Sequence, residues 1–160
     1  MVQVAFSGFA EPVARALAAG GLPAPEAQES GWAAAWLQAA GYKAAAMTLE
    51  ALADGVFTHS GLKVSHGLVD TAGVSCVWLA PALARLAQDN GRIVLINARH
   101  GLFVLPFTVR GNFGIGCPVD PSFAIGGERT KNPYAEKVAQ GEAEGVEVDD
   151  AQWTALLAHG

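Results

Sequence analysis

This 160-residue sequence carries little charge and no long apolar run. Charged residues make up 16% of it, against roughly 25% in an average globular protein, and its 15 acidic residues outnumber its 10 basic ones. The acidic balance argues against nucleic acid as a partner, because binding nucleic acid needs a basic face. No uninterrupted run approaches about 18 apolar residues, so we predict no membrane-spanning segment. Apolar residues reach 51%, which is too hydrophobic for an intrinsically disordered chain.

Cysteine and histidine are also sparse. The two cysteines, Cys76 and Cys117, match no zinc or redox spacing, and we expect two reduced, buried thiols in a cytoplasmic protein. Residues 1–6 lack the basic and apolar regions of a secretion signal. No pair among the four histidines has the spacing of helical metal ligands, so we predict no metal site.

Three helices are predicted in the first third of the chain. They run from about Phe9 to Ala19, from the Pro23–Pro25 pair to a stop at Gly41, and from about Lys43 to Ala53. Ser7 is the expected cap of the first helix. The apolar residues of that helix share one face: Phe9, Val13, Ala16 and Leu17. Alanine runs such as residues 33–35 favour helix formation and let neighbouring helices approach closely.

The middle of the chain changes character. Residues 58–73 are predicted to be irregular, with a short strand around 62–64. A further helix ends near Gln88. We expect it to start near Pro81, because a proline inside a helix that began at Cys76 would kink it.

Two strands and a glycine-rich segment are predicted next. The apolar, β-branched run 92–97 is typical of a central strand that is buried on both faces. Residues 101–109 are interpreted as a second strand, with Pro106 at an edge or a bulge. Residues 111–127 are expected to be irregular, with glycines that either adopt positive backbone angles or cradle an anion.

The C-terminal part is acidic before a last helix. Residues 136–150 hold six acidic side chains against one lysine, so we expect a solvated segment in which 146–148 forms a short edge strand. Asp149 or Asp150 is the predicted cap of a helix over 152–158. Its expected apolar face is formed by Trp153, Leu156 and Leu157.

These elements predict an α+β fold. An N-terminal helical bundle packs on a small mixed β-sheet, and a helix closes the chain. We predict one domain over residues 1–160, with a helical part at 1–55 and a mixed α/β part at 56–160. We find no internal repeat and no interdomain linker.

Chemistry-bearing residues lie near the end of the strand at 92–97. Arg99 and His100 follow it directly, and ligands of α/β sheets gather beyond the carboxyl ends of strands. His66, between a serine and a glycine, is a candidate general acid or base, and Cys117 is a candidate nucleophile if either histidine reaches it. The predicted ligand-binding residues are Arg99, Arg110, Asn112, Gly114 and Gly116. The competing explanation is structural: surface turns with a solvated arginine, turn glycines and a buried thiol.

Several alanine, glycine and leucine patterns recur along most of the chain: Ala16-x-x-Ala19-Gly20-Gly21-Leu22-Pro23, Glu26-Ala27, Trp36-Leu37-x-Ala39-Ala40-Gly41, Leu79-Ala80-Pro81-Ala82-Leu83 and Trp153-x-x-Leu156-Leu157. Together they resemble an uncharacterised bacterial family of small domains of unknown function. The resemblance implies a bacterial source and supplies no activity to carry over.

A second set of residues includes Val69-Asp70-Thr71-Ala72-Gly73, a helix over 80–87, the strand at 93–97, and His100. This order is similar to the malate/L-lactate dehydrogenase family of the non-Rossmann type, and Ser65-His66-Gly67 matches the letters of that family's catalytic motif. Here the motif lies further along the chain and no arginine follows it. The chain is also shorter than such an enzyme needs to hold its nicotinamide, so we predict no cofactor.

Two functions follow as hypotheses. The first is a cytoplasmic accessory domain without catalysis, which forms a homo-oligomer through apolar helix faces. The alternative is a protein or enzyme that binds a small organic acid. Its site would be formed by His66, Arg99, His100 and Arg110 together with the loop over 111–120, because two guanidinium groups suit a carboxylate.

Overall fold

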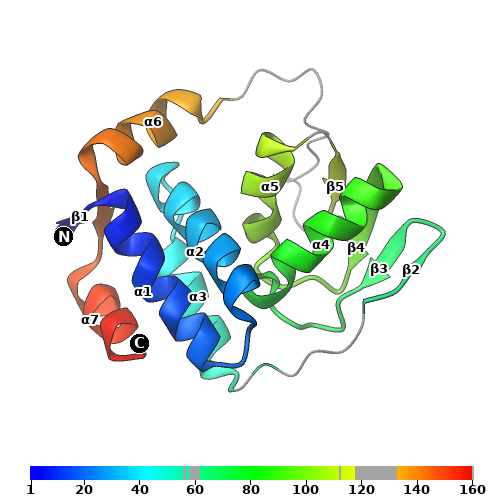
Figure 1. Ribbon diagram of the computed structural model, residues 1–160, viewed down its shortest axis with the longest axis horizontal. Helices are drawn as coiled ribbons and strands as arrows, with labels where there is room; N and C mark the ends of the chain where they lie inside the picture. The colour runs from blue at the N-terminus through cyan, green and yellow to red at the C-terminus, as the bar shows by residue number, and fades with distance from the viewer. Residues whose placement is uncertain (56, 58–61, 112, 118–132, 160) are drawn as a thin grey trace. The chain divides into compact units, whose positions relative to one another are not determined.

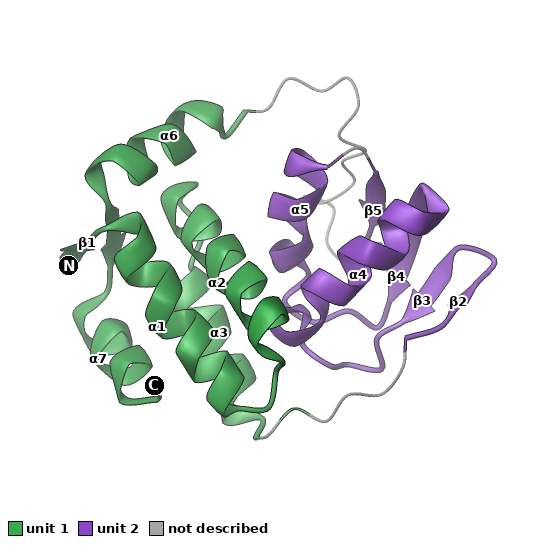
Figure 2. Ribbon diagram, viewed as in Figure 1, with its two compact units in different colours: residues 1–58, 133–160 green, residues 59–132 purple. Residues whose placement is uncertain are grey.

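The computed structural model describes residues 1–55, 57, 62–111, 113–117 and 133–159. The chain forms two compact units, residues 1–58 with 133–160 and residues 59–132 (Figure 2). The class is α+β, as predicted, with helices at the N-terminus, a mixed sheet and a C-terminal helix. The expected change of character after residue 55 lies close to the first boundary between the units. Residues 133–160, which we had placed in the mixed part, group with the helical unit.

The helical unit consists of five helices and one pair of strands among its described residues (Figure 1). The helices are α1 (Phe6–Ala19), α2 (Ala24–Ala39), α3 (Ala44–Ala53), α6 (Ala135–Glu144) and α7 (Asp150–His159). β1 (Val2–Val4) and β6 (Val146–Val148) pair antiparallel, which confirms the predicted strand at 146–148. The expected apolar face of α1 is fully buried. A Cβ at Gly31 of α2 would lie 2.5 Å from the Ala10 carbonyl oxygen, so small residues do bring α1 and α2 close together.

Most of the predicted boundaries in this unit are confirmed, and one cap is wrong. α2 starts directly after Pro23, and the Asp149 carboxylate accepts from the Gln152 amide at 3.0 Å and so caps α7. Ser7 does not cap α1, because the chain passes from β1 through the extended residue Ala5 straight into the helix. Leu157 is 47% exposed, so it does not belong to the buried face of α7.

α6 lies inside the acidic segment, where the sequence predicted only solvated chain and the strand at 146–148. Among its residues only Val138 and Gly141 are buried, which leaves almost no apolar periodicity to detect. Gly141 faces Ala39 of α2, where a Cβ would approach the alanine side chain to 2.5 Å. The helix is therefore held by a close contact between small residues rather than by an apolar stripe.

The mixed unit is built on a sheet with the strand order β2-β3-β4-β5 (Figure 1). Its elements are β2 (Val64–Ser65), β3 (Leu68–Asp70), α4 (Cys76–Asn90), β4 (Arg92–Ile96), the 3-10 turn η1 (Gly101–Val104), α5 (Leu105–Arg110) and β5 (Gly114–Gly116). β2 runs antiparallel to β3, whereas β3, β4 and β5 are parallel. α4 therefore connects β3 to β4, and η1 with α5 connects β4 to β5.

β4 is a central parallel strand, as predicted, but it is buried on one face only. The alternating residues Val69, Ile93, Leu95 and Ile115 are buried. On the other face Leu68 is 45% exposed and Ile96 is 38% exposed. α4 contacts both η1 and α5, so the two connections cover the same face and leave the opposite face of β4 partly open.

Two predictions about prolines are wrong for definable reasons. α4 starts at Cys76 and contains Pro81, because the Ser75 hydroxyl accepts from the Val77 amide at 3.1 Å and fixes the helix start five residues earlier than expected. Residues 101–109 form η1 and α5 rather than a strand. Pro106 lies in the first turn of α5, where its missing N–H has no intrahelical partner to lose.

The described part of the glycine-rich segment, residues 111 and 113–117, is more regular than predicted, and residues 118–127 lie outside the described residues. Residues 114–116 form β5, and neither Gly111, Gly114 nor Gly116 has a positive φ. A Cβ at Gly111 would collide with the Phe113 ring, so close packing is the reason for a glycine there. In residues 58–73 the strand expected around 62–64 lies at 64–65, and β3 pairs with it across a tight turn.

Candidate functional site

The loops after β3 and β4 meet at the carboxyl edge of the sheet in the mixed unit. The Thr71 amide donates to the Ile96 carbonyl at 3.1 Å, and the Cys76 amide donates to the Arg99 carbonyl at 2.8 Å. An isolated parallel bridge joins Ser75 to Arg99. The two loops therefore stay in register beyond the strands, at the edge where the sequence predicted a site.

Ser75 and His100 form a short side-chain contact at this edge. The Ser75 Oγ lies 2.6 Å from the His100 Nδ1. Ser75 is 1% exposed and caps α4, while His100 is half-buried and precedes η1 in the left-handed conformation (φ 54°, ψ 39°). The imidazole ring is thus anchored to the start of one helix and lies at the start of another.

Three residues other than glycine adopt positive φ at the same edge: Ala72 (52°), Asn97 (57°) and His100 (54°). For an L-residue this conformation costs about 1 kcal/mol, and asparagine tolerates it best. Hydrogen bonds compensate for part of this cost. The Asp70 carboxylate accepts from the Ala72 amide at 2.8 Å and from the Asn97 Nδ2 at 3.0 Å. Such concentrated strain is typical of sites where a ligand or substrate is positioned.

Asp70 is held in its charged form by this network. The hydrogen bond from Asn97, followed by that from the Ala72 amide, lowers the pKa of Asp70 below its usual value. The neighbouring Thr71 Oγ1 donates to the Asn97 carbonyl at 2.7 Å. Together these bonds join the end of β3 to the end of β4, so the role of the Asp70 carboxylate is to stabilise the conformation of the two loops.

The N-terminus of α4 is not itself an anion site. Its first four amides are already bonded. The Cys76 amide donates to the Arg99 carbonyl, the Val77 amide to the Ser75 hydroxyl, and the amides of Trp78 and Leu79 to the Ser75 carbonyl. A ligand at this edge therefore has to be held by side chains, and the half-buried Arg99 and His100 are the basic ones that the two loops supply.

The cysteines are free and buried, as predicted. Burial, and secondly the nearby Cys117, raises the pKa of the Cys76 thiol to about 12, which keeps it protonated. Because a thiolate is the reactive form, Cys76 is not a nucleophile at neutral pH. Ser75 is 1% exposed and Cys76 is fully buried, so neither can attack a substrate that binds outside.

The structure separates the predicted site residues into two groups. Arg99 and His100 follow β4, and Cys117 follows the parallel strand β5, so these three lie toward the carboxyl edge. His66 is exposed in the turn that precedes β3, at the amino edge of the parallel strands. Arg110 ends α5 just before β5 begins, and its guanidinium lies 5.3 Å from the Phe107 ring centre. The two arginines therefore do not form one clamp.

The remaining predicted residues have structural places or fall outside the described part. Gly114 and Gly116 lie within β5 and pair with Arg92 and Val94 of β4, and Asn112 lies outside the described residues. Ser75 and the pair Asp70 and Asn97 were not predicted as site residues from the sequence. Ser75 directly precedes an apolar helical run, which is an N-cap signal that could have revealed it.

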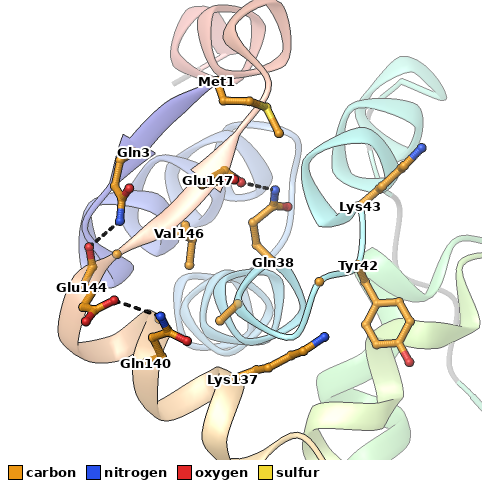
Figure 3. Close-up of a pocket in the computed structure, with 14 residues that line it drawn as sticks. Met1, Gln3, Gln38, Tyr42, Lys43, Lys137, Gln140, Glu144, Val146 and Glu147 are labelled. Carbon is orange, nitrogen blue, oxygen red and sulfur yellow. Dashed lines mark hydrogen bonds between the residues drawn. The ribbon is translucent and has the colours of Figure 1, made fainter.

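An open groove of about 510 Å³ lies in the helical unit (Figure 3). Its three glutamines are hydrogen-bonded within the unit. Gln3 donates to the Glu144 carbonyl at 2.8 Å, Gln38 to the Glu147 carbonyl at 2.7 Å, and Gln140 to the Glu144 carboxylate at 3.0 Å. The bonds of Gln3 and Gln38 join β1 to α6 and α2 to β6, and that of Gln140 lies within α6, so the groove is a junction between elements.

The comparisons with known proteins supply no family: no family model, no curated protein and no solved structure matches this chain. Within the part that the structure describes, no three histidine, cysteine or acidic side chains gather closely enough to hold a metal ion. None of the described helices is both long and apolar enough to cross a membrane. The geometry of the carboxyl edge is therefore the basis for assigning a function.

Proposed function

We propose that the mixed unit binds a small organic carboxylate at the carboxyl edge of its sheet, through Arg99 and His100. The observation that carries this proposal is the set of left-handed residues Ala72, Asn97 and His100 at one edge, with His100 hydrogen-bonded to a buried serine. Strained loops persist only where the surrounding bonds hold them, and they cluster at sites that bind or react.

The chemistry of the two side chains favours an anion with oxygen acceptors. A guanidinium group grips a carboxylate through two parallel N–H donors, and an imidazole adds a third donor at an angle that its anchor fixes. The protein has a formal net charge of −5, so a carboxylate would be repelled from most of its surface. Arg99 and His100 supply the local positive and donor groups that overcome this repulsion.

The site is better suited to binding and proton transfer than to covalent chemistry. Ser75 and Cys76 are buried, and the Cys76 thiol stays protonated. His100 is the one residue of the Ser75–His100 pair that is not fully buried, and an imidazole is the usual general acid or base near neutral pH. We therefore place the recognition of the carboxylate first and assign any proton transfer to His100.

A thermal-shift screen tests the proposal. Acetate, pyruvate, malate and succinate are added in turn, with nicotinamide nucleotides included because of the dehydrogenase resemblance. A ligand at about 100 times its Kd stabilises the fold by about 2.7 kcal/mol, which raises the Tm by several degrees. Arg99→Gln and His100→Ala should abolish this shift. Arg110→Gln is the matched control, because Arg110 lies toward the opposite edge of the sheet, and it should retain the shift.

If no organic acid shifts the Tm of the native protein, the proposal is wrong. It is equally wrong if Arg110→Gln removes the shift while Arg99→Gln keeps it, because the ligand would then sit at the amino edge.

The self-association hypothesis stays a prediction, with less support from the structure than from the sequence. Trp36 and Trp78, two large apolar side chains of α2 and α4, are only 5% and 4% exposed and so lie within their own units. The large apolar side chains exposed by more than a third in the described residues are Met1, Leu68, Ile96 and Leu157. Only one of these, Leu157, lies on a helix.

A further inference from the structure

The hydrogen bonds of Ser75 constrain which nitrogen of His100 carries the proton in the neutral ring. The Ser75 Oγ accepts from the Val77 amide at 3.1 Å and lies 2.6 Å from the His100 Nδ1. A serine hydroxyl has one hydrogen to donate, and Ser75 is 1% exposed, so water does not take that hydrogen. The ring nitrogen in contact with the hydroxyl is the Nδ1 of His100.

We propose that Ser75 is a positioning residue that holds neutral His100 as the tautomer protonated at Nε2. If Nδ1 carried the proton instead, the Ser75 Oγ would accept two hydrogen bonds and leave its own hydrogen without a partner among the described residues, in a buried place. An unsatisfied buried donor costs about 1–3 kcal/mol. With Ser75 as the donor, both groups are satisfied and the proton of the ring lies on Nε2.

The consequence for the proposed function is a fixed hydrogen-bond donor. A ring protonated at Nε2 donates to a carboxylate oxygen even when it carries no charge, whereas the other neutral tautomer would present a lone pair there. This part of the inference rests on carboxylate binding at the carboxyl edge. The tautomer itself does not, because it follows from the bonds of Ser75 alone.

The same hydroxyl caps α4, so the test has to separate the two roles of Ser75. Ser75→Thr keeps a hydroxyl that can both cap and donate. Ser75→Asp caps a helix as well as serine does, but its carboxylate can only accept, so it should pull the ring proton to Nδ1. Ser75→Gly removes the side chain at a cost of only a few tenths of a kcal/mol in capping and needs no additional space.

Nitrogen NMR of the imidazole rings reports the tautomer directly. At about pH 8.5, where an ordinary imidazole is neutral, we expect Nε2 of His100 to be protonated in the native protein and in Ser75→Thr. We expect the proton on Nδ1 in Ser75→Asp. His66 serves as an internal reference, because it is exposed in a turn away from this edge. A native ring protonated at Nδ1, or the same signal in the native protein and Ser75→Asp, would overturn the inference.

Binding supplies the second readout, with succinate as the probe. Ser75→Thr should bind within about twofold of the native protein, and Ser75→Gly should bind about two- to tenfold more weakly, because the donor is no longer held in place. Unchanged binding in Ser75→Gly would show that the serine does not position His100 for the ligand. If the native protein shows the expected tautomer but binds no carboxylate, the proposed function fails while the role of Ser75 stands.

Discussion

Because the Cys76 thiol is buried, the free energy of unfolding of the protein decreases as the pH becomes alkaline. Its pKa is about 12 in the folded protein, mainly because of burial, against an ordinary value of 9.0. A raised pKa means that the folded state keeps the thiol proton that the unfolded state releases. The stabilisation is therefore complete below about pH 9 and is lost as the pH rises from about 9 towards 12.

The size of the effect follows from the two pKa values. At about pH 10.5 the unfolded thiol is about 1.5 units above its pKa, while the folded thiol is still protonated. Each unit is worth 1.36 kcal/mol, so the folded state loses about 2 kcal/mol between about pH 8 and 10.5 through Cys76 alone. Cys76→Ala removes this pH-dependent contribution, whatever effect the substitution has on the free energy of unfolding at neutral pH.

Urea unfolding at the two pH values measures the difference. The native protein should lose about 2 kcal/mol more than Cys76→Ala over this range. Cys117→Ala is the control, because Cys117 is the smaller cause of the shift and its removal should leave most of the loss in place. Equal losses in the native protein and Cys76→Ala would refute the reasoning and would mean that the thiol ionises readily in the fold.

Two further predictions concern the packing and the site. Gly31→Ala should destabilise the helical unit by about 1–3 kcal/mol in urea unfolding, because the added Cβ would lie 2.5 Å from the Ala10 carbonyl oxygen, whereas Gly55→Ala meets no neighbouring atom and should cost only its backbone strain. The lowered pKa of Asp70 stabilises the fold above the ordinary carboxyl pKa, and this stabilisation disappears as the pH falls through the folded pKa. Asp70→Asn should therefore reduce the loss of unfolding free energy that occurs at acid pH. If this loss is the same in Asp70→Asn as in the native protein, the hydrogen bonds assigned to Asp70 are contradicted.

The helices of the first third were predictable because local signals agree there. Prolines begin α2, glycines end the helices, and the apolar residues of α1 recur at helical spacing. α6 was not predictable in the same way, because its buried contact consists of one valine and one glycine. Such a contact depends on the shape of the partner helix, and no pattern within the segment records it.

The error at residues 101–109 also explains the error in the site. Leu, Phe, Val and Thr residues favour a strand locally, but the six consecutive residues from Phe103 to Thr108 are all buried and lie in η1 and α5. If residues 101–109 formed a strand, Arg110 would lie just beyond the carboxyl end of that strand. The helix instead carries the chain back along the sheet, so Arg110 lies toward the amino edge. Arg99 and His100 were placed correctly because the strand before them was predicted correctly.

Ser75 could be recognised locally as a cap, but not as the partner of His100. The two residues are 25 positions apart, and their contact depends on the parallel pairing of β3 with β4. His100 also has a left-handed backbone, which is rare enough outside glycine that composition does not predict it.

The most direct test of the carboxylate site is an NMR titration of the labelled protein with the organic acid that gives the largest thermal shift. The account predicts that the signals of Ala72, Asn97, Arg99 and His100 move together with one Kd, and that those of His66 and Arg110 stay in place. Movement confined to the amino edge, or to the groove of the helical unit, would contradict it.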